Sequence, residues 1–364
     1  MKKRIVISAI SIRSGGMLSI LLDCLQELND DEYAQYEIDV IVKDPELVSG
    51  VNSKVNYITI DGTRSYFQRL SNEFFYFQKL SEKLKPFLWL SLHDVSPRVF
   101  AERQAVYCHN ATPFYEITWR ELRLEPKFGL FNLFYSFLYR LNIKRNRYVI
   151  VQQDWLRNVF HKLFKIPLDK IIVARPEVSL RLPANDISTN DIRRFIFPSL
   201  PRVWKNFELV CEASMKLVER GIKNFEVILT VNGDECPYAK LLKNEYGHLA
   251  NLKFIGMQPR QTLFELYAGS DCLIFPSKLE SWGLPISEFK LYRKPMLLAD
   301  LPYTHEAVGD YAEVSFFDPA SAEQLASLME RIIENDLSFK GNKLGTIPQP
   351  FAASWKELFR ILLK

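Results

Sequence analysis

The sequence predicts an α/β protein built from two doubly wound, Rossmann-like domains. Short apolar runs of strand length alternate with helical patterns along all 364 residues, which is typical of parallel sheets covered by helices on both faces. About six such runs fall in each half of the chain, and the length suits two domains of ordinary size.

The predicted strands follow one another at regular spacing. In the first half they are residues 5–10, 36–42, 88–92, 105–109, 148–152 and 171–174. In the second half they are residues 194–197, 225–231, 252–255, 272–275, 295–299 and 313–316. We therefore expect each half to form one parallel sheet.

A polar stretch separates the two halves. Residues 179–191 are rich in turn-forming residues and weak in apolar periodicity, so we predict a linker there. The first domain then covers residues 1–178 and the second covers residues 192–350. Residues 351–364 form a helix with one apolar face, which we expect to return to the first domain.

The composition is that of a globular protein, with 48% hydrophobic and 25% charged residues. The net charge of +4 is too small to indicate a nucleic-acid partner, and none is expected. Five scattered cysteines without zinc spacing predict buried free thiols in a reducing cytoplasm and no metal site. The chain lacks an apolar run of about 18 residues, so no transmembrane helix is expected.

The most informative motif is FPSKLESWGLPISEFK, at residues 275–290. It places Glu280 and Glu288 eight positions apart, on either side of the turn formed by Gly283, Leu284 and Pro285. Proline is favoured in a first helical turn, and glycine lets a ligand approach the backbone. Free N–H groups at such a turn attract phosphate. A ligand with hydroxyls at both ends and a diphosphate between them, such as a nucleotide-sugar, would suit this motif.

Two glycines follow the first predicted strand. Gly15 and Gly16 stand where the strand 5–10 turns into a helical pattern, and ligands of open parallel sheets bind at the carboxyl ends of strands. They could admit a phosphate or a sugar. An ordinary strand-to-helix turn is the alternative, since the run is not the GxGxxG of dinucleotide-binding proteins.

Polar residues also end two other strands of the first half. His109 and Asn110 follow the strand at 105–109, and His93 and Asp94 follow the preceding one. His109 could donate a hydrogen bond to a sugar or phosphate, and the two strand ends could converge. A histidine at a strand end can equally be structural, and that alternative stays open.

Two cations begin the helical pattern after strand 194–197. Arg202 and Lys205 lie at its start, where the helix dipole disfavours positive charge, so a shared anion would explain their placement. A forked arginine and a point-charge lysine both suit a diphosphate. A solvated charged turn is the alternative.

The segment at residues 128–139 is unusually aromatic and carries basic residues at both ends. Aromatic side chains with basic flanks suit the surface of an anionic bilayer. A buried helix with a basic end is the alternative.

Several second-half motifs together resemble family 4 retaining glycosyltransferases of the GT-B fold. These are residues 254–256, LFELYAGSD, FPSKLESWGLPISEFK and LPYTHEAVGD. The resemblance covers most of residues 197–319. In the first half it rests on Gly15, Gly16 and the strand ending at His109.

The resemblance implies that two Rossmann-like domains face each other across a cleft. By position, Glu288 matches the family's ribose-binding carboxylate, Glu280 the carboxylate that contacts the donor sugar, and Lys205 the diphosphate-binding lysine. His109 aligns with an active-site histidine near the transferred sugar. The resemblance also implies that neither a metal nor a cofactor is needed.

One family position departs from the pattern. An arginine usually stands five residues before the lysine, whereas this chain has Leu200 there. Arg202 is the candidate substitute.

The expected function is transfer of a sugar, with retention, from a UDP-, GDP- or dTDP-linked donor to a glycan or lipid-linked acceptor. His93, Asp94 and Asn110 would lie on the acceptor side. The implied setting is bacterial surface-polysaccharide synthesis, such as O-antigen, capsule or lipopolysaccharide, in the cytoplasm and peripherally on the plasma membrane.

Two other functions remain open. One is a catalytically degenerate protein that only binds nucleotide or glycan, which the leucine at position 200 favours. The other is a glycoside hydrolase that uses Glu280 and Glu288 as acid and base, since a pair of carboxylates is what that chemistry needs.

Overall fold

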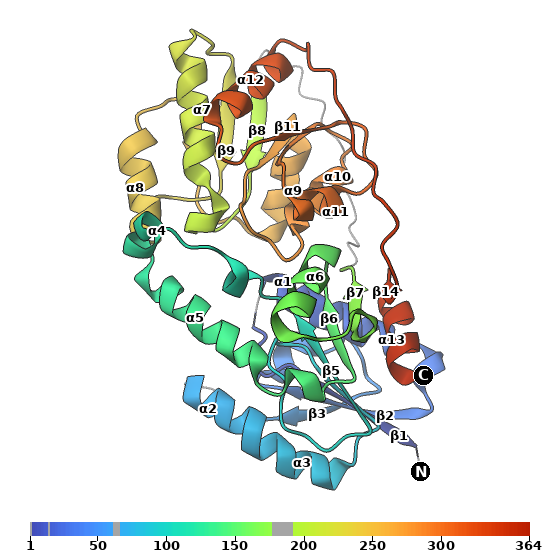
Figure 1. The fold of residues 1–364 in the computed structure, drawn as a ribbon. Coiled ribbons are helices and arrows are strands. Elements are labelled where there is room, and N and C mark those ends of the chain that lie inside the picture. Colours follow the sequence, from blue (N-terminus) through green and yellow to red (C-terminus); the bar gives the residue numbers. More distant parts are fainter. Residues whose placement is uncertain (1, 14, 61–65, 177–191) are drawn as a thin grey trace. The chain divides into compact units, whose positions relative to one another are not determined.

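The computed structural model describes residues 2–13, 15–60, 66–176 and 192–364 (Figure 1). The chain divides into two compact units. Unit 1 comprises Met1–Pro113, Leu133–Glu177 and Thr346–Lys364, and unit 2 comprises Phe114–Asn132 and Val178–Gly345. The predicted linker at 179–191 lies outside the described residues, and the predicted cleft between the domains stays a prediction.

Unit 1 is built on an eight-stranded sheet in which all neighbouring strands are parallel. The strand order is β14-β7-β6-β5-β4-β1-β2-β3. The strands are β1 (Lys3–Ser8), β2 (Tyr36–Val42), β3 (Asn56–Thr59), β4 (Leu88–Ser91), β5 (Arg103–Cys108), β6 (Tyr148–Val151), β7 (Ile171–Ala174) and β14 (Phe351–Ala352). The order reverses between β1 and β4, and such a switch point is where open α/β sheets bind ligands.

Helices lie on both faces of this sheet. They are α1 (Gly15–Glu27), α2 (Tyr66–Ser71), the π-helical turn η3 (Asn72–Tyr76), α3 (Phe77–Leu84), α5 (Pro126–Arg140, which begins in unit 2), α6 (Asp154–Phe164) and α13 (Trp355–Leu363). Short 3-10 turns occur at Asp31–Tyr33, Pro45–Val48, Thr112–Phe114, Ile143–Arg145 and Leu168–Lys170.

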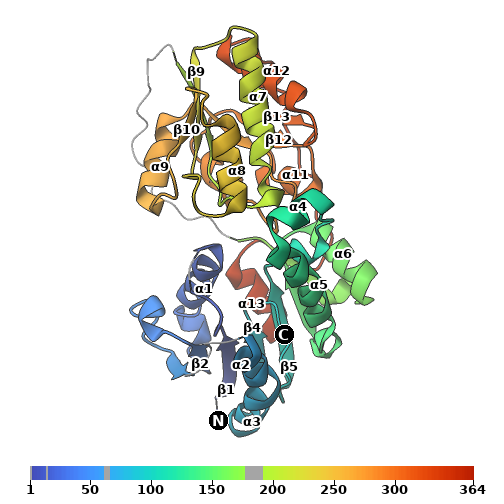
Figure 2. The ribbon, with the colours of Figure 1, turned by 90° about the vertical axis from the view of Figure 1, so that its left-hand side faces the viewer.

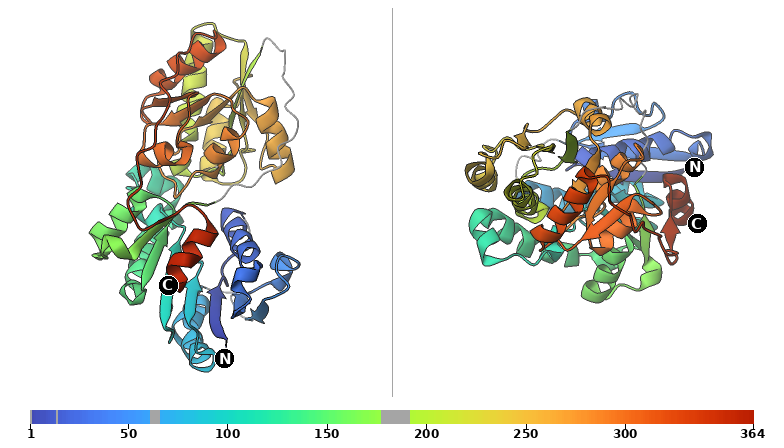
Figure 3. Two further views of the ribbon diagram at one scale, coloured as in Figure 1. Left: turned by 90° about the vertical axis from the view of Figure 1, so that its right-hand side faces the viewer. Right: turned by 90° about the horizontal axis from the view of Figure 1, so that it is seen from above.

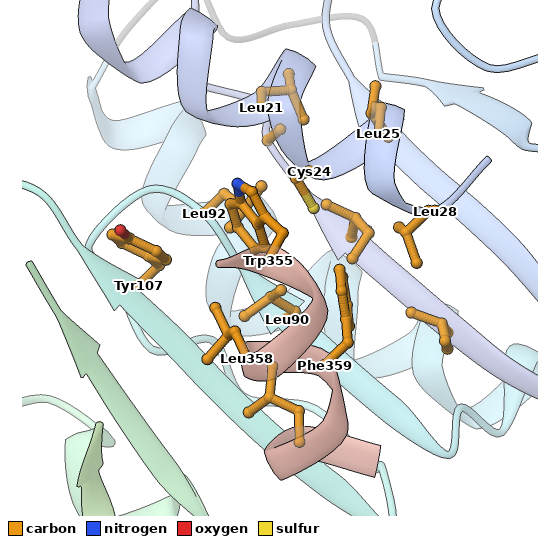
Figure 4. Packing of buried hydrophobic residues seen from close by; sticks show 14 of the residues in the cluster. Leu21, Cys24, Leu25, Leu28, Leu90, Leu92, Tyr107, Trp355, Leu358 and Phe359 are labelled. Atoms are coloured by element: carbon orange, nitrogen blue, oxygen red, sulfur yellow. The ribbon is translucent and has the colours of Figure 1, made fainter. Parts of the chain in front are cut away.

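Strand alternation decides which residues meet which helices. Ile5 and Ile7 of β1 belong to the core formed with α1 and α13, whereas Val6 belongs to a second cluster with Phe77 of α3 and Trp89 of β4. The C-terminal helix α13 lies beside α1 (Figure 3, left). Figure 4 shows Trp355 and Phe359 of α13 in this core with Cys24 of α1.

Unit 2 contains a six-stranded parallel sheet of order β10-β9-β8-β11-β12-β13. Its strands are β8 (Arg193–Phe197), β9 (Phe225–Leu229), β10 (Leu252–Phe254), β11 (Cys272–Phe275), β12 (Met296–Ala299) and β13 (Val314–Phe317). Its other elements are α4 (Trp119–Leu124), the 3-10 turn η7 (Val203–Lys205), α7 (Phe207–Glu219), α8 (Pro237–Tyr246), α9 (Arg260–Gly269), α10 (Leu284–Lys290), α11 (Pro302–Val308) and α12 (Ala322–Ile333). Here the order reverses between β8 and β11, which makes their carboxyl ends the switch point of this sheet.

Residues 114–132, called the arm below, group with unit 2 although the sequence assigned them to the first domain. The arm contains α4, which lies beside the N-terminal end of α7 (Figure 2). Its Phe128 ring stacks on Trp204 of η7, with the ring centres 4.3 Å apart. The predicted boundary therefore differs here because long-range contacts, rather than chain order, place the arm.

The fold class predicted from the sequence is confirmed, and each of the twelve predicted strands corresponds to an observed strand within a few residues. Two strands were missed. β3 is four residues long and half exposed, and β14 has only two residues, so neither produces a clear apolar run. The five cysteines are free, and four of them are buried. In the described residues, no helix combines the length and apolarity needed to cross a bilayer.

Candidate functional site

Two loops of unit 2 meet at the switch point between β8 and β11. One leads from β8 through η7 into α7, and the other leads from β11 into α10. The Lys278 N–H donates to the Trp204 carbonyl at 2.7 Å, and the Asn206 side-chain amide donates to the Pro276 carbonyl at 3.3 Å. Because these bonds join the two loops, residues far apart in the sequence are held side by side.

Lys205 and Glu280, which lie 75 positions apart in the sequence, form an ion pair across these loops. Their side chains are only 17% and 15% exposed. The Lys205 ammonium also lies 6.0 Å from the centre of the Phe275 ring. A lysine that is mostly shielded from water at a switch point is placed to bind an anion, with Glu280 as its counter-ion in this structure.

Glu288 lies in α10 and has different partners. Its carboxylate is buried, accepts a hydrogen bond from the Tyr267 hydroxyl at 3.2 Å, and lies 3.6 Å from the Arg260 guanidinium. Burial raises the pKa of Glu288, and Arg260 and the Tyr267 hydrogen bond act in the opposite direction. The two glutamates of the motif therefore stand in separate environments.

Gly283 caps the start of α10 with φ 92°, in the left-handed region that glycine favours. A Cβ there would also lie 3.2 Å from Ile286 Cδ1 and 3.6 Å from the Tyr303 ring. Leu284 and Pro285 then form the first helical positions, as the sequence predicts.

Arg202 is held by the arm. Its guanidinium lies 3.2 Å from Glu125 Oε2, and the side chain is 49% exposed. Glu125 Oε1 accepts the N–H of the next residue, Val203, at 3.0 Å. Lys278 is 3.2 Å from Glu121 of the arm, which also borders a polar pocket of about 310 Å³ between the arm and α7. The predicted contact of Arg202 with a diphosphate remains a prediction.

In unit 1, Asp94 holds the turn after β5. Its carboxylate accepts the N–H groups of His109 and Asn110 at 2.5 and 3.1 Å, and the hydroxyls of Tyr135 and Tyr139 at 3.0 Å each. Asp94 itself adopts φ 70°. The structure thus brings together the two polar strand ends that the sequence predicted to converge.

The His109 ring is largely enclosed. It stacks on Tyr107 with ring centres 4.5 Å apart, and its Nε2 lies 3.0 Å from the Leu92 carbonyl. Because only an N–H can bond that carbonyl, Nε2 carries the proton and Nδ1 is the free acceptor atom. Burial lowers the pKa of His109.

His93 belongs to a buried polar chain at the switch point between β1 and β4. Its Nε2 lies 2.9 Å from Ser8 Oγ at the end of β1, and its Nδ1 lies 3.1 Å from Glu73 of the π-helical turn. Arg69 donates to the His93 carbonyl at 2.8 Å. Burial raises the pKa of Glu73 to about 8, opposed by Arg69, and lowers that of His93.

The buried Glu73 predicts a pH dependence of stability. Between its ordinary pKa of 4.5 and its folded value of about 8, the folded state keeps a proton that the unfolded chain releases, so stability falls as the pH rises. His93 acts in the opposite direction only below its ordinary pKa of 6.5. Between pH 6.5 and 8, we expect the unfolding free energy of the wild type to fall by about 1.6 kcal/mol more than that of the Glu73→Gln variant. Urea unfolding measures this, and parallel curves for the two proteins would contradict it.

Gly15 and Gly16 begin α1 in unit 1, and Gly15 has φ 70° with open space where a Cβ would stand. They belong to a different unit from Lys205, Glu280 and Glu288. Their predicted part in donor binding therefore stays a prediction.

The residues of these two sites that were missed from the sequence include Glu73, Glu121, Glu125, Arg260 and Tyr267. A signal existed for three of these. Glu73 is a lone charge in the aromatic run NEFFYF, and Arg260 stands at a helix start, where the argument used for Arg202 applies equally. Glu121 stands three residues after Thr118, the spacing of a capping box, whereas nothing local distinguishes Glu125 or Tyr267.

The comparisons with known proteins agree with this architecture. Residues 188–344, most of unit 2, match the family model described as glycosyl transferases group 1. A comparison with curated proteins finds no sequence match.

Three solved structures show the similarity of the fold. Sucrose-phosphate synthase from Thermosynechococcus elongatus has 14% identity and a TM-score of 0.69, covering 92% of this chain and 90% of that one. WaaG, a glycosyltransferase involved in lipopolysaccharide biosynthesis, has 14% identity and a TM-score of 0.66, covering 91% and 90%. Anabaena Alr3699/HepE in complex with UDP has 16% identity and a TM-score of 0.64, covering 92% and 90%, and is also known with UDP-glucose.

The chain therefore has the architecture of GT-B glycosyltransferases, as the sequence resemblance implied. The family match in unit 2 supports a glycosyltransferase, and the assignment to family 4 stays a prediction.

Proposed function

We propose that this protein is a glycosyltransferase that moves a sugar from a nucleotide-sugar donor to a glycan or lipid-linked acceptor. The observation that carries the proposal is the contact between Lys205 and Glu280 at the switch point of unit 2. Two residues that the family resemblance assigned to one site, 75 positions apart, are neighbours in the fold. The match of residues 188–344 to a glycosyltransferase family supports the same conclusion.

The chemistry of the proposed site follows from charge. The leaving nucleoside diphosphate gains negative charge as the glycosidic bond breaks, and a fixed cation stabilises that charge where catalysis benefits most. Lys205 would supply this cation, and the diphosphate would compete with Glu280 for it. Glu280 would then be released to accept hydrogen bonds from hydroxyls of the donor sugar, while Glu288 would accept hydrogen bonds from the ribose hydroxyls.

Retention of configuration and independence of metal ions belong to the proposal, and the family resemblance is their support. NMR of the product would show the anomeric configuration directly. Full turnover in EDTA is expected. Inversion at the anomeric carbon would overturn the proposed retention of configuration. A need for an added divalent cation would overturn the proposed independence of metal ions.

The first experiment is thermal stabilisation by UDP, GDP and dTDP. A ligand at a hundred times its dissociation constant raises the unfolding free energy by about 2.7 kcal/mol. The structure of HepE with UDP makes UDP the first choice. The matching nucleotide-sugars are then incubated with glycan and lipid-linked acceptors. Stabilisation by none of the three nucleotides would overturn the proposal.

A catalytically degenerate binding protein is the second candidate. The pairing of Arg202 with Glu125 favours it, because the residue expected to replace the family arginine is engaged elsewhere. Nucleotide binding without transfer across a panel of acceptors would support this candidate. A glycoside hydrolase has less support, since Glu280 and Glu288 have separate partners.

We propose further that the enzyme acts in the synthesis of a bacterial surface polysaccharide, on the cytoplasmic face of the plasma membrane. Helix α5 supports the membrane contact. Its exposed large apolar side chains, at 39% to 75% exposure, are Leu130, Phe131, Leu133, Phe134 and Phe137. At 100° per residue these five positions form one continuous arc of the helix.

Helix α5 predicts binding to anionic vesicles that weakens as salt rises. The double substitution Leu133→Glu and Phe137→Glu should reduce cosedimentation with phosphatidylglycerol vesicles several-fold. It removes apolar area that the bilayer would bury and adds negative charge that the anionic lipid repels. Leu163→Glu is the matched control, since Leu163 is 48% exposed on a different helix, α6. Equal losses in both variants, or wild-type protein that stays in the supernatant, would contradict the proposed contact.

A further inference from the structure

The arm makes a set of directed contacts with η7, the turn that carries Lys205. Glu125 accepts the Val203 N–H with one oxygen and lies 3.2 Å from the Arg202 guanidinium with the other. Both the Glu125 side chain and Val203 are buried. The Lys205 N–H in turn donates to the Arg202 carbonyl at 2.8 Å. One carboxylate thus fixes the two residues on which the Lys205 turn is built.

Other arm residues support the same region. Phe128 stacks on Trp204, the residue immediately before Lys205, and Glu121 lies 3.2 Å from the ammonium of Lys278, two residues before Glu280. Both loops that form the ion pair between Lys205 and Glu280 are therefore in contact with the arm.

The arm is itself ordered by internal bonds. Thr118 and Glu121 form a reciprocal capping box at the start of α4, and Glu121 also accepts the Tyr115 hydroxyl at 2.7 Å. The Asn132 amide donates to the Tyr115 carbonyl at 2.9 Å, which closes the arm at its far end. A rigid support of this kind can hold a functional side chain in one position.

We propose that Glu125 is a positioning residue for Lys205, acting through η7 so that the ammonium meets the donor diphosphate. This inference rests on the proposed function. Without the Glu125 carboxylate, the buried Val203 N–H loses its acceptor and Arg202 loses its counter-ion, so the turn loosens.

The opposite role would give an effect of opposite sign. If Glu125 withheld Arg202 from the diphosphate, removing the carboxylate would free Arg202 and strengthen nucleotide binding. The direction of the change in affinity therefore separates positioning from inhibition.

The experiment measures binding of whichever of UDP, GDP and dTDP stabilises the wild type most, by calorimetry, together with KM and kcat for the matching donor. Glu125→Ala should weaken nucleotide affinity about tenfold and, because it acts through Lys205, should lower kcat more than it raises KM. Glu125→Gln keeps an oxygen for the Val203 N–H and should restore affinity to within about threefold of wild type. Glu116→Ala, an exposed glutamate of the same arm, is the matched control and should leave affinity unchanged.

A double-mutant cycle tests whether Glu125 acts through Lys205. The double variant Lys205→Ala with Glu125→Ala should bind no more weakly than Lys205→Ala alone, because the positioned group is already gone. Additive losses would indicate a general structural role and overturn the proposal. If Glu125→Ala does not fold, Phe128→Leu removes the stacking on Trp204 and should weaken affinity about threefold.

The outcomes separate the two proposals. A wild type that binds none of the three nucleotides overturns the proposed function and this inference with it. This inference alone is overturned if the wild type binds a nucleotide and Glu125→Ala binds it as tightly or more tightly. Where Glu125→Ala does not fold, the same result for Phe128→Leu overturns it.

Discussion

Lys205→Ala is expected to lower the rate of sugar transfer by about 10²- to 10³-fold, the usual cost of removing one fixed group that stabilises developing negative charge. Lys205 is the cation at the switch point of unit 2, and its side chain is mostly shielded from water, so solvent would replace it poorly. Initial rates with saturating donor and acceptor measure the effect. The loss should appear mainly in kcat, because the charge on the leaving diphosphate grows in the transition state.

Two controls make this result specific. Lys340→Ala removes an exposed lysine of the same unit and should leave the rate unchanged. Lys205→Ala leaves the Glu280 carboxylate without its counter-ion, which can lower stability. The double variant Lys205→Ala with Glu280→Gln removes that charge, so a recovery of stability assigns the loss to the unpaired carboxylate. A Lys205→Ala enzyme with wild-type kcat would remove Lys205 from the catalytic site.

Glu288→Gln is expected to weaken nucleotide affinity by about 10- to 100-fold, because each hydrogen bond to a charged acceptor contributes roughly 1.5 to 3 kcal/mol. The carboxylate lies buried between Tyr267 and Arg260, where it could accept two ribose hydroxyls. Calorimetry with UDP and with 2′-deoxy-UDP measures the effect. Glu288→Gln should reduce the affinity for 2′-deoxy-UDP less than the affinity for UDP, because the deoxy nucleotide has one ribose hydroxyl fewer to bond to the carboxylate.

The pH dependence of the same affinity follows from burial. Since burial raises the pKa of Glu288, the group takes up a proton at a higher pH than an exposed glutamate does. Nucleotide affinity should therefore fall as the pH is lowered through that pKa, and the fall should be absent in Glu288→Gln. Glu265→Gln, an exposed glutamate on the neighbouring helix α9, is the matched control. Identical profiles in wild type and Glu288→Gln would assign the titration to another group.

Strand positions were predictable because apolar runs of four to six residues are a local signal. The resemblance to a known family, and not the residue pattern alone, assigned Lys205 and Glu280 to one site. Their contact in the structure fits that assignment, since both residues follow strands and the carboxyl ends of parallel strands meet at one edge.

The contacts of the arm had no such signal. The bond between Glu125 and the Val203 N–H joins residues 78 positions apart, and the helical pattern of the arm is equally compatible with either domain. Glu73 carries a local signal as a lone charge in an aromatic run, but its raised pKa depends on complete burial beside His93, which only the packed structure determines. Predictions failed where a side chain's partner is set by long-range packing rather than by local periodicity.

The chain path through the arm also bears on protein engineering. Cutting the sequence near residue 178 leaves the arm on the N-terminal fragment and η7 on the C-terminal one, although both belong to unit 2. A chimera that joins the first half of one such enzyme to the second half of another would then pair mismatched partners at Glu125 and Val203. Recombination between two such chains should therefore give a folded protein only when residues 114–132 are taken from the same parent as the C-terminal half.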